Sequence, residues 1–293
     1  MVSIISIANQ KGGVGKTTTA VNLAACLAKA GRKTLLVDMD PQGNATSGLG
    51  VDKHSVPFTV YELLMEDGRS PREIMFNPLF DDLYLIPSNI QLIGAEIELP
   101  REEQQEFRLK GVLQKISSEF EFIIIDAPPS LGPLTINALS ASSHLVIPVQ
   151  SEYYALEGLS LLMETVRRVR GAFNPDLHIL GLLLTMYDGR TNLARQVSED
   201  VRHHFGNLVF RSVIERTVKL SEAPSYGQPI ISYDPSSRGA ESYERFTREL
   251  IQRIELLDNN ITGASEPSDL PESNSRQEVS LGEKEEESPG SGS

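Results

Sequence analysis

The chain has 293 residues, 40% of them hydrophobic, and Cys26 is its one cysteine. This length suffices for one large α/β domain or two small ones, and a single cysteine excludes an internal disulfide and a cysteine-ligated metal cluster. The net charge of −13 argues against a surface that is basic throughout. We see no signal peptide and no run of roughly 20 apolar residues that could span a bilayer, so we expect a cytoplasmic protein.

Short apolar segments alternate with amphipathic ones along most of the chain. Strands are predicted at residues 2–8, 33–37, 83–87, 122–125, 145–149 and 179–185. Helices are predicted at residues 17–30, 102–119, 133–141, 155–170, 191–205 and 236–257. Alternation of this kind predicts an α/β fold, with a doubly wound, mostly parallel β-sheet and helices on both faces.

The last part of the chain has a different composition. Residues 259–293 are rich in Ser, Glu, Pro and Gly, and residues 258–293 hold nine acidic residues against two basic ones. A segment of this kind cannot bury enough apolar surface to offset its chain entropy. We therefore predict a folded domain at residues 1–258 and an acidic disordered tail at residues 259–293. With much of the negative charge in the tail, the domain has room for a local basic patch.

A glycine-rich segment follows the first predicted strand and precedes the first predicted helix, which is the context that a phosphate-binding P-loop requires. Its glycines let backbone N–H groups converge on phosphate oxygens, and the helix directs its positive end at the same anion. Lys16 would supply a charge to the β- and γ-phosphates, and Thr17 a hydroxyl to Mg²⁺. An ordinary glycine-rich turn is the weaker alternative. The predicted nucleotide site consists of Lys11, Gly12, Gly13, Val14, Gly15, Lys16, Thr17 and Thr18.

The loop departs from the standard G-x-x-x-x-G-K-[ST] pattern at its first glycine and carries a second lysine. Gln10 stands where that pattern has its first glycine, and a second lysine, Lys11, follows it. Since Lys16 already serves the phosphates, Lys11 has no obvious target within one subunit. It is either a solvated surface lysine or a lysine that reaches the nucleotide of a neighbouring subunit.

Carboxylates follow two of the predicted strands. Asp38 and Asp40 come after the second strand and Asp126 after the fourth. In a parallel sheet these positions face the ligand crevice. Asp126 fits a Walker B residue that holds Mg²⁺ through water better than it fits a helix cap. Either Asp38 or Asp40 would contact Mg²⁺ or orient the attacking water.

Taken together, these segments resemble the ParA-type partition ATPases, a deviant Walker A group that includes Soj-like chromosome-segregation proteins and the related MinD proteins. The resemblance covers roughly residues 2–257, and the combination of motifs is far more specific than a P-loop alone. The residues that carry it are Lys11-Gly12-Gly13-Val14-Gly15-Lys16-Thr17, Asp38-Met39-Asp40-Pro41-Gln42-Gly43-Asn44, Ile125-Asp126-Ala127-Pro128-Pro129 and Leu220-Ser221-Glu222-Ala223-Pro224-Ser225-Tyr226-Gly227.

The resemblance implies a Mg²⁺-dependent ATPase of weak intrinsic activity, with ATP and Mg²⁺ as cofactors. Lys11 would be the signature lysine that contacts the phosphates of the partner subunit in an ATP-sandwich homodimer. Asp40 would position the hydrolytic water and join Thr17 and Asp126 at the metal. ATP binding would form the dimer, and hydrolysis would reverse it.

The resemblance also implies two switch segments, at residues 40–48 and 126–132, and an adenine site near Met186. Soj-like relatives bind DNA without sequence preference through surface cations. The matching region here offers Arg190, Arg216 and Lys219. A solvated, mixed-charge helix face is the alternative for these three residues.

The partners that follow are nucleoid DNA and a ParB-type centromere-binding protein that stimulates hydrolysis, which makes the expected location cytoplasmic and nucleoid-associated. Three rivals share the loop. The first is a MinD-like membrane-associated ATPase or a cargo-positioning ATPase. The membrane-associated type would need a basic amphipathic C-terminal helix, and anionic lipid would repel the acidic tail, so we expect no membrane partner. An iron–sulfur reductase would need several cysteines, and a metabolic P-loop ligase or kinase would need a small-molecule pocket, to which no motif points.

Overall fold

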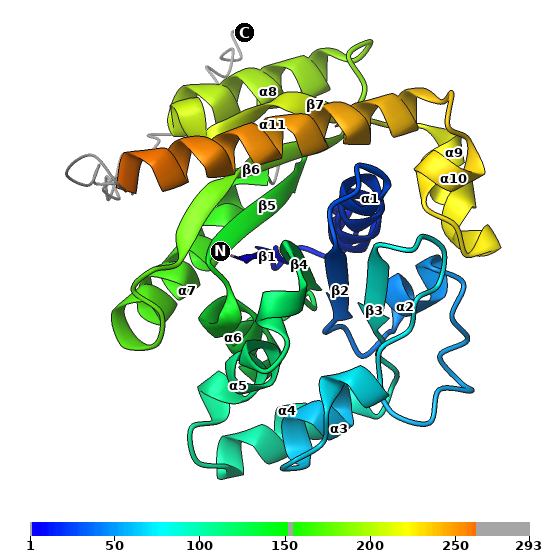
Figure 1. Cartoon of the computed structure of the whole chain (residues 1–293). Helices are drawn as coiled ribbons and strands as arrows, with labels where there is room; N and C mark the ends of the chain where they lie inside the picture. The colour runs from blue at the N-terminus through cyan, green and yellow to red at the C-terminus, as the bar shows by residue number, and fades with distance from the viewer. Residues whose placement is uncertain (1, 152–154, 262–293) are drawn as a thin grey trace, which may run out of the picture.

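The computed structural model describes residues 2–151 and 155–261, and its strands form one parallel sheet (Figure 1). The strand order is β3-β2-β4-β1-β5-β6-β7, and each neighbouring pair is parallel. The predicted doubly wound α/β fold is therefore confirmed. The strands are β1 (Ser3–Ile7), β2 (Thr34–Asp38), β3 (Leu83–Ile86), β4 (Phe122–Asp126), β5 (His144–Gln150), β6 (His178–Tyr187) and β7 (Val209–Glu215).

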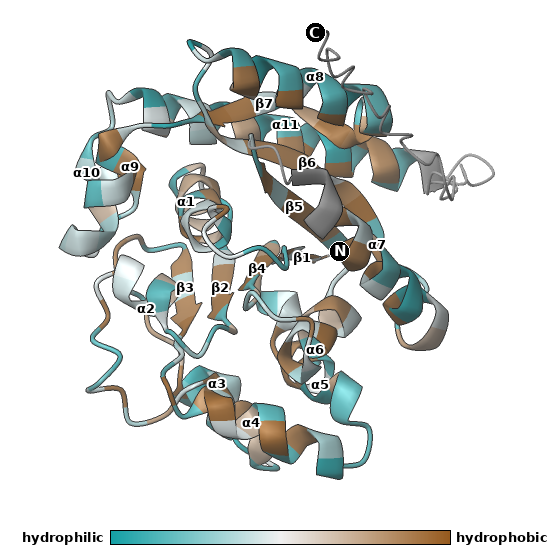
Figure 2. Ribbon diagram, turned by 180° about the vertical axis from the view of Figure 1, so that it is seen from behind, coloured by the Kyte–Doolittle hydropathy of each residue, from teal (hydrophilic) through white to brown (hydrophobic). Residues whose placement is uncertain are grey.

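Helices cover both faces of the sheet, as Figures 1 and 2 show. One apolar core lies between the sheet and α1, α2 and α9 to α11, and the other between the sheet and α3 to α8. The helices are α1 (Lys16–Lys29), α2 (Asn44–Gly48), α3 (Val60–Met65), α4 (Leu92–Glu98), α5 (Arg108–Gln114), α6 (Pro133–Ala141), α7 (Ala155–Ala172), α8 (Asn192–Phe205), α9 (Val218–Glu222), α10 (Ile230–Tyr233) and α11 (Arg238–Ile261).

The central strands are apolar throughout because both of their faces are buried. In β4, Ile124 packs into the core beneath α1 and α11, whereas Ile123 and Ile125 point into the opposite core. In Figure 2 the strands are mostly brown, whereas the outer sides of several helices are teal. Burial on both faces explains why these strands appear in the sequence as continuous rather than alternating apolar runs.

Two sequence-based expectations fail. The helix predicted at residues 102–119 is wrong, since the only α-helix in that range is α5, flanked by short 3₁₀ turns. The reason is that the residues before α5 offer little apolar surface to bury, and the chain turns at Gln104 with a φ of 51°. The edge strand β7 was not predicted, because the polar Arg211 and Ser212 interrupt its apolar pattern.

The last helix also runs further than expected. α11 continues to Ile261, three residues past the predicted end of the domain at 258. The remainder of the predicted tail, residues 262–293, lies outside the described residues. Within the part of the chain that is described, no helix is both long and apolar enough to cross a bilayer.

Candidate nucleotide-binding site

The glycine-rich loop lies between β1 and α1, at the carboxyl end of a strand flanked by β4 and β5. Gly13 and Gly15 have φ angles of 75° and 84°, a left-handed conformation that glycine adopts without steric cost. Side chains from outside the loop hold it in place. The Asn9 amide donates to the Pro148 carbonyl (2.7 Å), and the Thr185 hydroxyl donates to the Val14 carbonyl (2.8 Å). The loop is thus fixed against β5 and β6 as well as β1.

Lys16, the first residue of α1, is almost fully buried, with 6% of its surface exposed. Its ammonium donates to the Lys11 carbonyl at 3.1 Å, so the side chain folds back over the loop. Burial lowers the pKa of Lys16, while the charges of Asp126 and Asp40 oppose that shift. A desolvated cation beside convergent backbone N–H groups is the arrangement that a phosphate chain requires.

Asp126 ends β4, opposite Ile7 of β1 on one side and Asp38 of β2 on the other. It is fully buried, and neither of its carboxylate oxygens has a hydrogen-bond partner among the residues that the structure describes. Burial, and then repulsion from Asp38, holds the pKa of Asp126 well above its usual range. Unused lone pairs on a buried carboxyl are expected where a cation or its bound water completes the site. The residues present therefore fit Mg²⁺.

The other candidate ligand of a metal is the Thr17 hydroxyl, which belongs to the first turn of α1. No group of three or more His, Cys, Asp or Glu side chains that could hold a metal occurs among residues 2–151 and 155–261. This agrees with a site in which phosphate oxygens, a hydroxyl and water provide most of the ligands, as is usual for Mg²⁺ bound with a nucleotide.

Asp38 and Asp40, which the sequence left as alternatives, have different surroundings. Both Asp38 oxygens are occupied: one accepts from the Asp40 N–H, and the other from the N–H and the hydroxyl of Thr46. Burial raises the pKa of Asp38 to about 6. Asp40 accepts from the Gln42 N–H through one oxygen, and its second oxygen accepts no hydrogen bond from the described residues. The Asp40 carboxylate is therefore the more available of the two.

Met186, the residue expected near adenine, adjoins the loop through its neighbour Thr185, whose hydroxyl bonds to Val14. It has a φ of 51°, a left-handed conformation that costs a non-glycine residue about 1 kcal/mol. Such strained residues cluster at ligand sites. The residue is 36% exposed, so it is accessible from solvent.

The three candidate DNA contacts lie past the carboxyl ends of β6 and β7. Arg190 donates to both oxygens of Asp188 (2.8 and 2.7 Å), and Lys219 donates to Glu222 (3.0 Å). These bonds from Arg190 lower the pKa of Asp188 to about 2. Arg216 is exposed and forms no ion pair with any described residue. The structure brings these cations to the same edge as the nucleotide site but pairs two of them with carboxylates.

Sequence reasoning missed several residues that organise this edge. Asn22 of α1 donates to the Thr18 carbonyl and accepts from the Ile230 N–H, which joins the phosphate loop's helix to α10. Gly50 and Gly227 touch through their backbones, and a Cβ on Gly227 would lie 2.5 Å from the Gly50 Cα. An asparagine inside a helix and a glycine in a loop give no sequence signal for such contacts, because their partners lie about 180 to 210 residues away.

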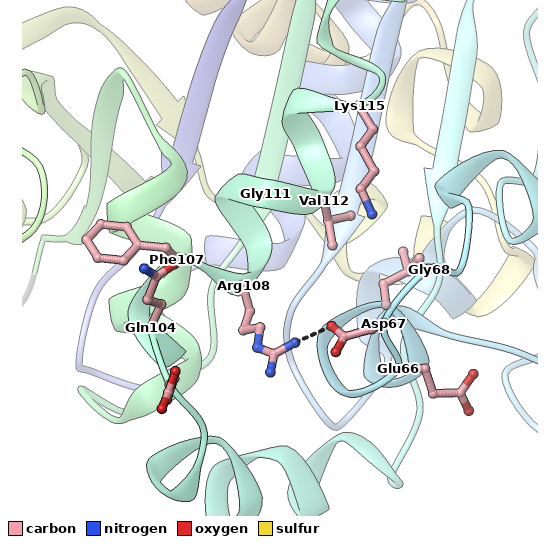
Figure 3. Close-up of a pocket in the computed structure, with 11 residues that line it drawn as sticks. Glu66, Asp67, Gly68, Gln104, Phe107, Arg108, Gly111, Val112 and Lys115 are labelled. Carbon is pink, nitrogen blue, oxygen red and sulfur yellow. Dashed lines mark hydrogen bonds and ion pairs between the residues drawn. The ribbon is translucent and has the colours of Figure 1, made fainter.

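A surface pocket of about 270 Å³ lies elsewhere, between the end of α3 and α5 (Figure 3). Arg108 crosses it to reach Asp67 at 2.7 Å, and Lys115 and Glu66 lie nearby. None of the residues of the phosphate loop lines this pocket. Its volume is below the roughly 300 Å³ at which small-molecule sites begin, so we do not assign it to the nucleotide.

Known proteins resemble this chain in sequence and in fold. A family described as an AAA domain matches residues 2–179. The chain is 57% identical over 250 residues to the sporulation initiation inhibitor protein Soj of Bacillus subtilis, covering 85% of this chain and 98% of that protein. It is 53% identical to the chromosome partitioning protein ParA of Myxococcus xanthus, covering 85% and 88%. A cobyrinic acid a,c-diamide synthase structure from Mycobacterium smegmatis, with bound ADP and magnesium, has a TM-score of 0.77 and 38% identity, covering 87% and 96%.

Proposed function

The chain belongs to the Soj/ParA family of chromosome-partitioning ATPases, and from this premise we propose that ATP joins two copies into a homodimer that binds DNA and that hydrolysis releases it. Its cofactors are ATP and Mg²⁺, in keeping with the ADP and magnesium in the synthase structure that resembles it. The higher identity to the partition proteins favours this function over that of a biosynthetic synthase.

The observation that carries the ATPase proposal is the buried Asp126 carboxyl near Lys16, whose two oxygens have no hydrogen-bond partner in the described part of the chain. Lys16 and the loop N–H groups would bind the phosphates, and the Thr17 hydroxyl, Asp40 and Asp126 would hold the metal, with Asp126 acting through water. When bound, Mg²⁺ neutralises the charge that develops on the phosphate oxygens. Asp40, with one carboxylate oxygen still available, orients the attacking water. We expect the intrinsic rate to be low.

The sandwich homodimer is supported by Gly12. A Cβ built on this residue meets nothing within 4 Å among the described residues of its own subunit, so their packing does not require a glycine there. A partner that approaches closely would require one. In the proposed dimer Lys11 contacts the partner's nucleotide, and each γ-phosphate supplies the differential affinity that favours the dimer. Gly12→Val is expected to bind ATP and remain monomeric by size exclusion with ATP, and an ATP-dependent dimer of that variant would refute the sandwich.

DNA binding is proposed for Arg190, Arg216 and Lys219. Because Asp188 and Glu222 already pair with two of them, a DNA phosphate must compete with those carboxylates. We therefore expect Arg216 to contribute most. A dimer doubles these contacts, and the release of counterions makes the binding salt-sensitive and independent of sequence.

The remaining parts of the proposal follow from family membership. A ParB-type centromere-binding protein stimulates hydrolysis, and the protein works in the cytoplasm on the nucleoid without a membrane partner. The ATPase domain extends to the end of α11 at Ile261, and the acidic residues that follow lie outside the described residues.

The decisive experiment measures DNA binding by Asp40→Ala, which is expected to trap the ATP dimer, with ATP and with ADP at two salt concentrations. Arg216→Glu in the same background is the control, and Arg190→Glu a second one. Tight, salt-sensitive binding with ATP alone, lost in Arg216→Glu, supports the proposal. Clear dimerisation without DNA binding would instead favour a MinD-like or cargo-positioning ATPase.

A further inference from the structure

Ser88 is a fully buried serine that has no part in the function described so far. It follows β3, the neighbour of β2 at the edge of the sheet. Its hydroxyl donates to the Asp40 carbonyl at 2.8 Å, and its N–H donates to the Thr46 hydroxyl at 2.9 Å. One residue from a separate strand connection therefore contacts both ends of the segment that carries Asp40.

Thr46 connects Ser88 to Asp38 through hydrogen bonds. Its hydroxyl donates to an Asp38 oxygen at 2.7 Å, and the other Asp38 oxygen accepts from the Asp40 N–H at 3.1 Å. Asp38, Thr46, Ser88 and Asp40 thus form a closed ring of hydrogen bonds, which we call the Asp40 ring. All four residues are buried, with Asp40 the most exposed at 7%. In so dry a setting each hydrogen bond is strong and a lost partner is costly.

The segment that carries Asp40 also packs closely against the Ser88 backbone. Gly43 has a φ of 61°, and a Cβ on it would lie 2.7 Å from the Ser88 carbonyl oxygen. Ser88 therefore meets the segment at Asp40, Gly43 and Thr46. The segment cannot shift relative to β3 without losing these contacts.

We infer that Ser88 and Thr46 are positioning residues for ATP hydrolysis. They act through Asp40 by fixing its backbone, so that its available carboxylate oxygen points to one place. The inference rests on the proposed role of Asp40 in orienting water. Catalytic groups are effective only when held close to the productive geometry, and a displacement of about 1 Å costs on the order of 100-fold in rate. Neither residue reaches the phosphate loop in the structure, so their loss should leave nucleotide binding intact.

The test compares two matched pairs of variants. Ser88→Ala removes the hydroxyl that holds the Asp40 carbonyl, and Ser140→Ala removes a buried hydroxyl that has no hydrogen-bond partner among the described residues. Thr46→Val removes a hydroxyl and keeps the side-chain volume, whereas Thr46→Ser keeps the hydroxyl. The full chain is used, and kcat, KM for ATP and the affinity for an ATP analogue are measured separately.

We expect Ser88→Ala and Thr46→Val to lose about tenfold in kcat with KM and analogue affinity unchanged. Ser140→Ala should turn over at the wild-type rate, and Thr46→Ser should recover most of the turnover that Thr46→Val loses. Adding Ser88→Ala to Asp40→Ala should lower the residual rate no further, because residues that act as a unit are not additive.

Wild-type kcat in a folded Ser88→Ala, or equal rates in Thr46→Ser and Thr46→Val, would overturn the inference. So would a loss of kcat in Ser88→Ala that persists in the Asp40→Ala background. The proposed function has a separate readout in Asp40→Ala alone: wild-type turnover there would remove Asp40 from the mechanism and the positioning role with it. A slow Asp40→Ala beside a fast Ser88→Ala would overturn only the positioning role.

Discussion

The two ends of the parallel strands, which we call the amino edge and the carboxyl edge of the sheet, differ in how far their buried polar groups are hydrogen-bonded. The described residues contain five buried side-chain atoms without a hydrogen-bond partner, and four of them follow the carboxyl ends of β1, β4 and β5: Gln10 Oε1, both Asp126 oxygens and Ser151 Oγ. At the amino edge, Asn174 donates to the Leu139 and Ser142 carbonyls, and Ser143 bonds to Ile4 and His144. The amino edge satisfies most of its buried polar groups within the chain, and Ser140 Oγ is its one unpartnered atom among the described residues. The other four gather at the carboxyl edge, which is where a ligand would complete them.

The strongest test of this contrast is Lys16→Ala at the carboxyl edge. We expect ATP affinity to fall by at least about 100-fold, because the phosphates lose their buried counter-charge. The measurement is titration with a fluorescent ATP analogue. Lys29→Ala, at the far end of the same helix and exposed beside Glu244, should bind as wild type. Normal affinity in Lys16→Ala would mean that the loop is not the phosphate site.

His144 tests the amino edge through pH. Burial, and then the nearby His178, lowers its pKa to about 4, while Asp258 opposes the shift. In the unfolded chain the pKa of His144 is near 6.5, so between about pH 6.5 and pH 4 the side chain binds a proton when unfolded but not when folded. The free energy of unfolding therefore falls as pH drops from about 6.5 to about 4, by about 3 kcal/mol from this group, and is unaffected by it above that window. Urea unfolding should show that the free energy of unfolding falls more steeply with decreasing pH in the wild type than in His144→Gln. The same pH dependence in both proteins would contradict the prediction.

Asp126→Asn separates stability from function at the carboxyl edge. Burial disfavours the Asp126 carboxylate more strongly than the charge of Lys16 favours it, so the change should stabilise the nucleotide-free protein by about 2 kcal/mol. It should also abolish the extra stability that ATP and Mg²⁺ confer. Thermal unfolding with and without ATP and Mg²⁺ measures both effects. A lower melting temperature in the nucleotide-free variant would show that Asp126 is satisfied within the chain and would remove the contrast between the edges.

Asn174→Ala is the corresponding change at the amino edge and has the smallest expected effect. It removes the side-chain donor of the Ser142 carbonyl and leaves the Leu139 carbonyl with the Ser142 N–H, and it should cost about 1 kcal/mol of stability. ATP affinity should stay at the wild-type value, because the residue lies at the opposite end of the strands. Denaturant unfolding together with analogue titration checks both statements. A change in affinity would show that the two edges are coupled.

The sequence predicts the features that depend only on residues close together along the chain. The phosphate loop is one uninterrupted segment, and alternating strands and helices are enough to predict a parallel sheet. The choice between Asp38 and Asp40 could not be made from their spacing, because it depends on Thr46 occupying one Asp38 oxygen. Ser88 was missed for the same reason, since its role arises only when β3 lies beside β2. The edge strand β7 was missed because burial on one side leaves an interrupted apolar pattern.

The contact between Gly50 and Gly227 also limits how this chain can vary. Both residues have positive φ angles, 78° and 63°, and a Cβ on Gly227 would overlap the Gly50 Cα. A side chain at position 227 would have to push the two segments apart, and one at position 50 would be tight against the Gly227 carbonyl oxygen at 3.1 Å, although the two residues are separated by more than half of the chain. A protein engineer who grafts a new loop at one of these positions, or recombines segments from two relatives, must therefore keep both glycines together.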